Sequence, residues 1–315
     1  MMRPWREVWG EALYGLDGFY RRAEGPAGHF TTSAHGDLGA VLAEVVARLA
    51  DDSGVCRVVD LACGRGELLA HLHDQRPDLS LVGVDVVERP AGLPRAVEWV
   101  RSPGGAALPD ELCDLDALVI AHEWLDVVPC TVAEVDETGV LREVLVDARG
   151  DEGLGDELAG AERAWADGWW PATEPGARVE VGLSRDLAWR ELVSRSSSGL
   201  TVAVDYGHTR TTRPAHGSLT AYREGRVADP VPDGQRDLTA HVATDSLGAD
   251  EVLTQRELLH RLGVAATTPD HATATSDPLG YVRALGRSSS IAALTDPRGL
   301  GGFHWAMTRH TRGHA

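Results

Sequence analysis

Two groups of residues combine side-chain types and spacings that could do chemistry. The first is residues 60–66 (Asp-Leu-Ala-Cys-Gly-Arg-Gly), an acid near the end of an apolar run followed by a glycine loop. Glycines lack a Cβ, so such a loop lets the backbone approach a ligand closely, and a helix that begins there offers free N–H groups to a polar or anionic group. The second is residues 122–126 (His-Glu-Trp-Leu-Asp), which place a histidine, an aromatic ring and two carboxylates within five positions. These types suit proton transfer and the binding of a cation.

The glycine loop distinguishes between two classes of ligand. A dinucleotide site requires a third glycine at position 69, where this chain has Leu69, so the pattern disfavours a nicotinamide oxidoreductase. A strand acid, a small residue and Gly-x-Gly are instead typical of S-adenosylmethionine sites, in which the loop wraps the methionine and the ribose. We therefore predict that Asp60, Ala62, Gly64 and Gly66 bind S-adenosylmethionine.

An acid at the end of the next strand would complete this site. Asp85 follows the apolar run of residues 79–84 and lies 19 positions after Gly66. A carboxylate in this place accepts hydrogen bonds from the ribose hydroxyls, so we predict that Asp85 binds the ribose. For Asp60, three roles stay open: orienting the loop, facing the methionine amine, or a structural role.

The elements that must position these residues alternate between strands and helices. Buried apolar runs predict strands, and apolar residues at helical spacing predict helices. The strands are expected over residues 56–61, 79–84, 97–100, 115–121 and 200–204, and the helices over residues 38–49, 66–72 and 186–193. This alternation implies right-handed crossovers and an α/β, Rossmann-like fold with a mostly parallel sheet and helices on both faces.

The rest of the chain predicts the domain organisation. We expect residues 1–36 to form an N-terminal arm or cap, and residues 37–315 to form a single domain with insertions at about 131–180 and 207–245 on the substrate side. A hairpin is expected over residues 131–146. The Gly-, acid- and Trp-rich residues 150–178 are expected to lie over the sheet, residues 249–262 to be helical, and residues 303–308 to form a last, edge-type strand.

The composition excludes several classes of function. The net charge is −18, from 30 basic and 48 acidic residues, which argues against nucleic acid as a partner because such binding depends on neutralising phosphates. The sequence contains no lysine, which excludes a P-loop lysine and Schiff-base chemistry. Its four cysteines lie far apart without a Cys-x-x-Cys pair, so neither a metal site nor a disulfide framework is expected. The polar first ten residues predict neither a signal peptide nor a membrane span, and we expect a cytoplasmic protein.

Several motifs together resemble those of the MidA-type methyltransferases. Residues 122–129 (His-Glu-Trp-Leu-Asp-Val-Val-Pro) are similar to the Asn-Glu-Phe-Phe-Asp-Ala-Leu-Pro motif of that family. The remaining similarities follow in the family's order, from residue 14 to about residue 262. They are the N-terminal signature from Tyr14-Gly15 through residues 30–33 (Phe-Thr-Thr-Ser), residues 204–208 (Val-Asp-Tyr-Gly-His), residues 217–223, Asp229-Pro230 and residues 237–242 (Asp-Leu-Thr-Ala-His-Val).

The resemblance implies a class I methyltransferase fold and, through a mitochondrial complex I assembly factor in the family, methylation of a protein arginine. On that basis we expect Glu123 and Asp126 to bind the guanidinium group, and His122 or His241 to accept a proton. Structural roles stay open for all four, as helix-capping or solvated carboxylates or as hydrogen-bonded histidines. His122 replaces the family asparagine, and Asp85 stands where many members have Glu.

Two further departures, His29 before Phe30 and Ala34-His35 in place of Pro-Glu, lie near the expected substrate entrance. The acceptor is therefore less defined than the cofactor. A small-molecule O- or N-methyltransferase and a non-catalytic S-adenosylmethionine-binding assembly factor are the alternatives, and a homodimer stays open.

Overall fold

The computed structural model describes residues 1–22 and 36–311. The motif residues 30–33 and the departures at positions 29, 34 and 35 lie outside the described residues. The main sheet has seven strands in the order β16-β17-β10-β5-β2-β3-β4. Its strands are β2 (Arg57–Leu61), β3 (Ser80–Asp85), β4 (Glu98–Arg101), β5 (Leu115–His122), β10 (Ser196–Asp205), β16 (Glu251–Thr254) and β17 (His304–His310).

The central strands run parallel, as the apolar runs predict. β4, β3, β2, β5 and β10 pair in parallel, whereas β17 pairs antiparallel with β10 and β16 antiparallel with β17. The chain moves outward from β2 to β4 in one direction and from β5 to β10 in the other, so the order reverses between β2 and β5. Ligands of doubly wound sheets bind at this point, beyond the carboxyl ends of the strands.

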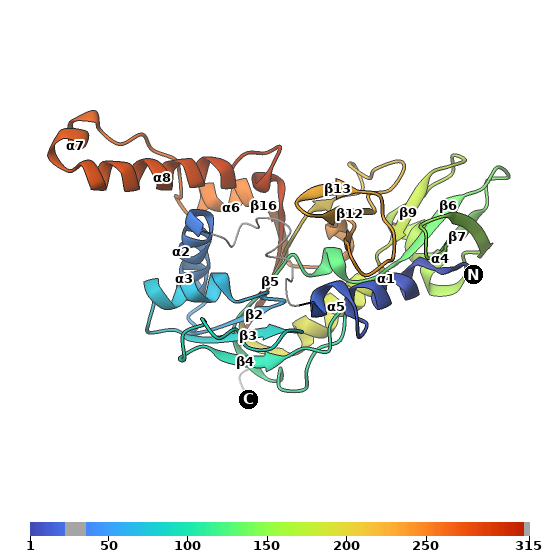
Figure 1. The fold of residues 1–315 in the computed structure, drawn as a ribbon, viewed down its shortest axis with the longest axis horizontal. Helices are drawn as coiled ribbons and strands as arrows, with labels where there is room; N and C mark the ends of the chain where they lie inside the picture. The colour runs from blue at the N-terminus through green and yellow to red at the C-terminus, as the bar shows by residue number, and fades with distance from the viewer. Residues whose placement is uncertain (23–35, 312–315) are drawn as a thin grey trace.

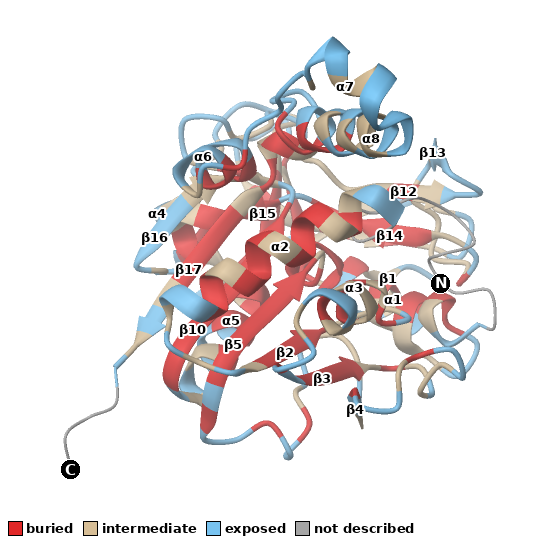
Figure 2. Cartoon of the chain, turned by 90° about the vertical axis from the view of Figure 1, so that its left-hand side faces the viewer, coloured by how far each residue is buried: buried red, intermediate tan, exposed pale blue. Residues whose placement is uncertain are grey.

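Helices cover both faces of the main sheet. One face packs against α2 (Gly36–Asp52), α3 (Glu67–Gln75), α6 (Gln255–Arg261) and the end of α8 (Pro278–Leu294), whose leucines, valines and isoleucines form one apolar core. Figure 2 shows α2 lying across this face, with its sheet-facing side buried. The other face packs against α5 (Leu183–Ser194) through Ala188, Trp189 and Leu192. The parallel strands are thus buried on both faces.

A second sheet lies at the other end of the molecule (Figure 1). Its path is β1-β7-β6-β9, and β8 also pairs with β7. The strands are β1 (Arg3–Pro4), β6 (Thr131–Val135), β7 (Leu141–Val146), β8 (Glu152–Glu157) and β9 (Arg178–Val181). β6 and β7 form the predicted hairpin. α1 (Trp5–Tyr14) packs against this sheet and buries Trp5, Trp9 and Leu13.

Short elements complete the fold. The remaining strands are β11 (Gly207–His208), β12 (Thr220–Arg223), β13 (Arg226–Ala228), β14 (Asp237–Thr239) and β15 (Val242–Ala243). The remaining helices are η1 (Phe19–Arg21), η3 (Leu125–Val127), α4 (Gly160–Trp169), η4 (Thr244–Ser246), α7 (His271–Ser276) and η5 (Leu300–Gly302). α7 and the first half of α8 project away from the body (Figure 1). No helix of the described residues combines the length and apolar character that a membrane span requires.

Three sequence expectations were wrong. Residues 150–178 do not lie over the main sheet: β8 extends the second sheet, because its backbone pairs with β7. Residues 249–262 are not one helix, because β16 pairs with β17 and Thr254 then starts α6 with a capping box to Glu257. β17 is not an edge strand, because β16 covers its outer side.

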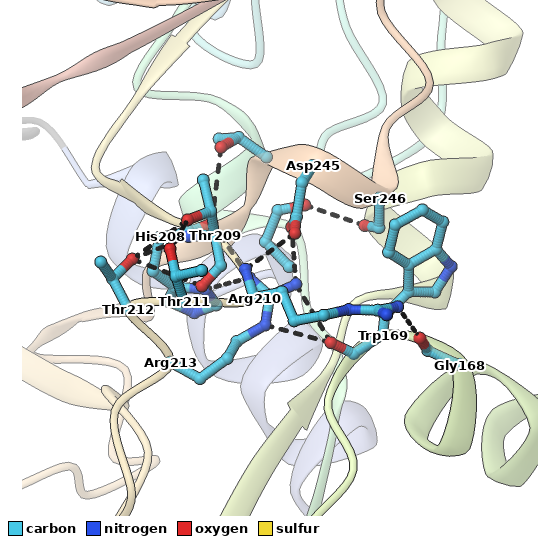
Figure 3. A network of polar contacts seen from close by, with 12 residues as sticks. Gly168, Trp169, His208, Thr209, Arg210, Thr211, Thr212, Arg213, Asp245 and Ser246 are labelled. Carbon is cyan, nitrogen blue, oxygen red and sulfur yellow. Dashed lines mark hydrogen bonds and ion pairs between the residues drawn. The ribbon is translucent and has the colours of Figure 1, made fainter.

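A polar network joins the segment after β11 to the end of α4 (Figure 3). Arg213 donates from Nη2 to Asp245 Oδ1 across 2.5 Å and from Nη1 to His208 Nδ1 across 2.6 Å. Burial and the Arg213 charge lower the pKa of His208 to about 3, so its ring is neutral and accepts this bond. Arg210 donates to the carbonyl of Gly168. The network therefore anchors the second inserted region to the first.

Candidate active site

The candidate site lies where β2 and β5 end side by side. Ala62 and Glu123 directly follow these strands, and both have positive φ, 58° and 54°. A left-handed backbone is costly for residues other than glycine and is concentrated at functional sites. Both residues line one cavity of about 720 Å³. The two groups of residues singled out in the sequence therefore meet at the point where the strand order reverses.

One half of the cavity is built by the glycine loop. Gly64 and Gly66 have φ of 59° and 80°, the region that favours glycine. The N–H of Gly64 donates to Asp85 Oδ2 across 2.8 Å, and the N–H of Val87 donates to Asp85 Oδ1 across 3.1 Å. Burial raises the pKa of Asp85 to about 6, against these two hydrogen bonds, which lower it. The carboxylate is thus fixed in place, and each oxygen keeps a lone pair that could accept from a ribose hydroxyl.

Leu69 packs the helix after the loop, α3, against the main sheet. Leu69 is fully buried, and a Cβ added at Gly83 of β3 would lie 2.9 Å from its Cδ1. Helix α3 and strand β3 therefore approach each other closely at Gly83. Position 69 holds a leucine that packs in the core, whereas a dinucleotide site would have a glycine there. Asp60 is buried and lines the cavity, and burial together with the charge of Asp85 raises its pKa well above the usual range.

The other half of the cavity is acidic. Glu123, Asp126 and Asp237 line it, and Asp205 lies behind Asp126; we call these four residues the acidic cluster. They come from the end of β5, from η3, from the end of β10 and from β14. Among the described residues, no arginine forms an ion pair with any of the four.

Glu123 and His122 share the end of β5. The Glu123 N–H donates to the Val204 carbonyl across 2.8 Å, which holds the residue at the strand end. Its Oε1 lies 3.3 Å from His122 Nδ1, but no described group forms a hydrogen bond with that oxygen. Burial, with the charges of Asp126 and Asp237, raises the pKa of Glu123 to about 8, and burial lowers the pKa of His122 to about 4. At neutral pH the histidine is therefore neutral.

Asp126 is held by its neighbours on both sides. Its Oδ2 accepts from Thr239 Oγ1 across 2.8 Å, and its N–H donates to Asp205 Oδ1 across 3.2 Å. Asp126 Oδ1 and Asp205 Oδ2 are buried without a hydrogen-bond partner among the described residues. Burial raises the pKa of both carboxyls, and their mutual repulsion adds to this for Asp205. Two adjacent carboxyls of this kind cannot both ionise without a cation nearby.

Two tyrosines from the N-terminal segment close the acidic half. Tyr20 OH donates to Asp237 Oδ1 across 2.6 Å, and Tyr14 OH donates to the Val127 carbonyl across 3.2 Å. Their rings stack with centroids 5.6 Å apart. Burial raises the pKa of Asp237 to about 8, although the bond from Tyr20 opposes this. Aromatic faces beside carboxylates are suited to an organic cation.

His241 lies apart from the described lining of the cavity. Its side chain is exposed, and its ring stacks on Tyr206 with centroids 5.8 Å apart. Its carbonyl accepts a hydrogen bond from Arg185 Nη1. The other predicted residues, Asp60, Ala62, Gly64, Asp85, His122, Glu123 and Asp126, line the cavity together, with Gly66 beginning α3 behind them.

Five residues of this region were not predicted as site residues. Tyr14, Asp205 and Asp237 belong to motifs that carried the family resemblance, so their place in those motifs was a signal for their role. Tyr20 lies within the N-terminal signature that begins at Tyr14, so the same signal applies to it. Nothing in the sequence singled out Arg185, because its contacts come from distant segments of the chain.

Comparison with known proteins places the chain in a family. The sequence profile described as "Putative S-adenosyl-L-methionine-dependent methyltransferase" matches residues 38–263, more than half of the chain. This match confirms the predicted family type, enzyme class and cofactor. No match was found among curated proteins.

Solved structures agree on the fold. Two crystal structures from Burkholderia thailandensis, one bound to S-adenosyl-homocysteine and one native, share 23% identity with this chain. Each match has a TM-score of 0.75 and covers 100% of this chain and 89% of the other. The predicted Rossmann-like fold is confirmed.

Proposed function

We propose that this chain, which belongs to the S-adenosyl-L-methionine-dependent methyltransferase family, methylates the guanidinium group of a protein arginine. The observation that carries the proposal is the acidic cluster: four carboxyl groups, three of them buried and that of Glu123 half-buried, without a cationic side chain paired to them among the described residues. Burying such groups is costly unless a cation joins them. A positively charged acceptor would supply the missing charge.

The geometry of the cluster favours a guanidinium among cations. Glu123 Oε1 and Asp126 Oδ1 are acceptors that lack a described hydrogen-bond partner. A guanidinium is planar and presents several N–H donors at once, so it can serve two carboxylates together. An ammonium has three donors around one point and would pair with fewer of these oxygens. The stacked Tyr14 and Tyr20 rings offer faces against which a planar cation can lie.

The residues of the chain would orient the acceptor nitrogen and take its proton. When bound, S-adenosyl-L-methionine supplies a methyl group on a positively charged sulfur. Glu123 and Asp126 would hold two guanidinium nitrogens so that the third faces the cofactor half of the cavity, and positioning of this kind lowers the barrier strongly. Glu123 would receive the released proton at Oε1, because this oxygen has no described hydrogen-bond partner and is ionised once it pairs with the guanidinium.

The glycine loop would hold the cofactor. Asp85 would accept from the ribose hydroxyls, Ala62, Gly64 and Gly66 would allow close approach of the backbone, and Asp60 would face the methionine amine. The fit rests on two observations: the Asp85 carboxylate is preset by two backbone amides, and the left-handed φ of 59° at Gly64 brings bare backbone to the cavity wall.

The proposal is tested by following the methyl group. The purified chain is incubated with methyl-labelled S-adenosyl-L-methionine and a cell extract, and the labelled products are separated into protein and small-molecule fractions. We expect label in protein, and hydrolysis should release it as methylated arginine. Label in small molecules, or in another amino acid, would overturn the arginine assignment.

A matched control separates turnover from background. The Glu123→Gln variant keeps the shape of the side chain and removes its charge, so it should bind S-adenosyl-homocysteine but leave the extract unlabelled. If no label is transferred by either protein while both bind S-adenosyl-homocysteine, the chain acts as a cofactor-binding factor under these conditions and the proposed acceptor fails.

A further inference from the structure

We propose that Arg185 is a positioning residue of the acceptor site: its buried guanidinium holds the loop after β5 against the segment after β14 and places a positive charge behind the acidic cluster. The inference rests on the proposed function only in taking the acidic cluster as the acceptor site. Arg185 lies on α5, which packs on the opposite face of the main sheet from the glycine loop's helix α3.

The guanidinium is bound entirely by backbone carbonyls. Nη2 donates to the carbonyl of Asp126 across 2.8 Å, and Nε donates to that of Val128 across 3.1 Å. Nη1 donates to the carbonyls of Ala240 and His241, both across 3.0 Å. One side chain therefore ties two segments that lie more than a hundred residues apart in the chain.

These bonds fix the main chain on which Asp126 stands. The Asp126 carbonyl also accepts from the N–H of Ala240 across 3.1 Å, so both segments meet on this one oxygen. Thr239, directly before Ala240, donates to the Asp126 carboxylate. The Arg185 bonds thus determine where the Asp126 carboxylate lies relative to the cavity.

The charge of Arg185 is not neutralised by a described carboxylate. Arg185 is 2% exposed, and no described acid lies within ion-pair distance. Its Cζ lies 5.6 Å from the centroid of the Trp9 ring. Carbonyl dipoles and an aromatic face offset a full charge only in part, and a buried charge without a counter-ion is costly. The charge therefore acts on its surroundings, where it lowers the pKa of Asp126 against the effect of burial.

Several ionisable groups face Asp126 from the elements around it, and a pH measurement must account for them. They are Glu123 beside it, Asp205 from β10, Asp237 from β14, Arg185 from α5, His241 after β14, and the tyrosines at positions 14, 20, 206 and 222. Arg185 is the only permanent cation among them. Replacing it by an uncharged residue should therefore shift the pKa values of the acidic cluster more than replacing any other residue of α5 by an uncharged one.

The test compares Arg185→Lys and Arg185→Met with the unaltered chain. Aspartate carboxyl carbons are labelled with ¹³C, S-adenosyl-homocysteine is bound, and the pH is varied; Asp126→Asn assigns the Asp126 signal. Arg185→Met should raise the midpoint of that titration by at least about one pH unit, since the positive charge is lost. Arg185→Lys keeps the charge, so its midpoint should stay close to that of the unaltered chain.

A second measurement reports the positioning. An arginine-containing peptide is titrated into each protein with S-adenosyl-homocysteine bound. Arg185→Lys should bind it about tenfold more weakly, because one ammonium cannot serve four carbonyls, and the affinity for S-adenosyl-homocysteine should stay within about twofold, since its predicted contacts with Gly64 and Asp85 are not touched. The sequence contains no lysine, so the ammonium of this variant gives a single resolved signal that shows whether it is charged and buried.

The outcomes separate this inference from the proposed function. An unchanged Asp126 midpoint in a folded Arg185→Met protein would overturn the electrostatic role, and an unchanged peptide affinity in Arg185→Lys would overturn the positioning role. If Arg185→Met does not fold, Arg185→Gln, which also removes the charge, replaces it in the carboxyl titration, and Arg185→Lys still decides the positioning role. If the unaltered chain does not bind the arginine peptide, the proposed acceptor is wrong, and the carboxyl titration still decides whether Arg185 sets the state of Asp126.

Discussion

The N–H of Gly64 donates to Asp85 Oδ2 across 2.8 Å, so the carboxylate that we assign to the ribose also holds the glycine loop in shape. The same carboxylate accepts from the N–H of Val87 through its other oxygen. The loop geometry therefore depends on the same side chain that we propose for cofactor binding.

Replacing Asp85 by Asn should weaken cofactor binding about 10- to 100-fold, equivalent to about 1.4–2.8 kcal/mol. An amide can accept only through its oxygen, so its NH₂ group would face a backbone N–H and one of the two bonds would be lost. Calorimetry with S-adenosyl-homocysteine measures the effect. Asp74→Asn, on the exposed side of α3, is the matched control and should bind normally. Equal affinities for the two variants would contradict the role of Asp85.

Glu123→Gln should reduce methyl transfer about 100-fold or more while cofactor binding stays within about twofold. The amide cannot take a proton or balance a cation, and loss of a positioned acid–base group typically costs this much. The rate of label transfer from S-adenosyl-L-methionine measures the change, with Glu111→Gln on an exposed turn as control. A variant that retained full transfer would exclude Glu123 from the reaction.

Binding of an arginine peptide should tighten as the pH rises from 6 to 8. The pKa values of Glu123 and Asp237 are both raised to about 8, so these groups are largely protonated at the lower pH and must ionise to pair with a cation. For each proton released on binding, the affinity should rise about tenfold per pH unit. Titration at several pH values measures this slope, and affinity that falls with pH would show that the carboxylates do not bind the peptide.

The stability of the chain should change in the opposite direction. In the unfolded chain Glu123 and Asp237 lose their protons near pH 4, whereas in the folded chain they keep them up to about pH 8. Between these values the folded state holds more protons, so the free energy of unfolding should fall as pH rises, by up to about 1.4 kcal/mol per unit for each group. Urea unfolding at pH 5, 6.5 and 8 should show a shallower slope for Glu123→Gln with Asp237→Asn.

The sequence was sufficient for the parts of the fold that rest on local patterns. β5 could be predicted because a parallel strand buried on both faces is a continuous apolar run. The glycine loop could be predicted because its left-handed φ values require residues that occur in a recognisable order. The position of Asp85 at the end of β3 could be predicted from the apolar run before it, whereas its contact with the ribose stays a prediction.

Features that depend on distant segments could not be predicted in the same way. The residues of β16 were predicted to begin a helix. They form a strand because their backbone pairs with β17, which lies about fifty residues later in the chain. The guanidinium of Arg185 is bound by backbone carbonyls, which carry no sequence signal. Asp237 reaches the site because β14 pairs with β12 and packs beside η3.

Tyr20→Phe should shift the pH dependence of peptide binding upward. Tyr20 OH donates to Asp237 Oδ1, and this bond lowers the pKa of Asp237, so its loss should make that carboxyl ionise at a higher pH. Tyr14→Phe is the matched control, because Tyr14 OH donates to the Val127 carbonyl and to no carboxylate. The midpoint of binding against pH should move for the first variant by about half a unit or more. Equal shifts for both would mean that ring packing, rather than the bond, determines the effect.

Ala62→Gly should be tolerated far better than glycine substitutions elsewhere. Ala62 has φ of 58°, and relief of a left-handed backbone contributes about 1–2 kcal/mol, which offsets the entropy that glycine loses on folding, about 0.5–1 kcal/mol. Ala70→Gly, inside α3, gains no such relief and should lower the free energy of unfolding by about 1 kcal/mol. The two variants, measured by urea unfolding, should therefore differ by at least about 1 kcal/mol in favour of Ala62→Gly. Equal destabilisation would show that the turn after β2 does not hold Ala62 in the left-handed region.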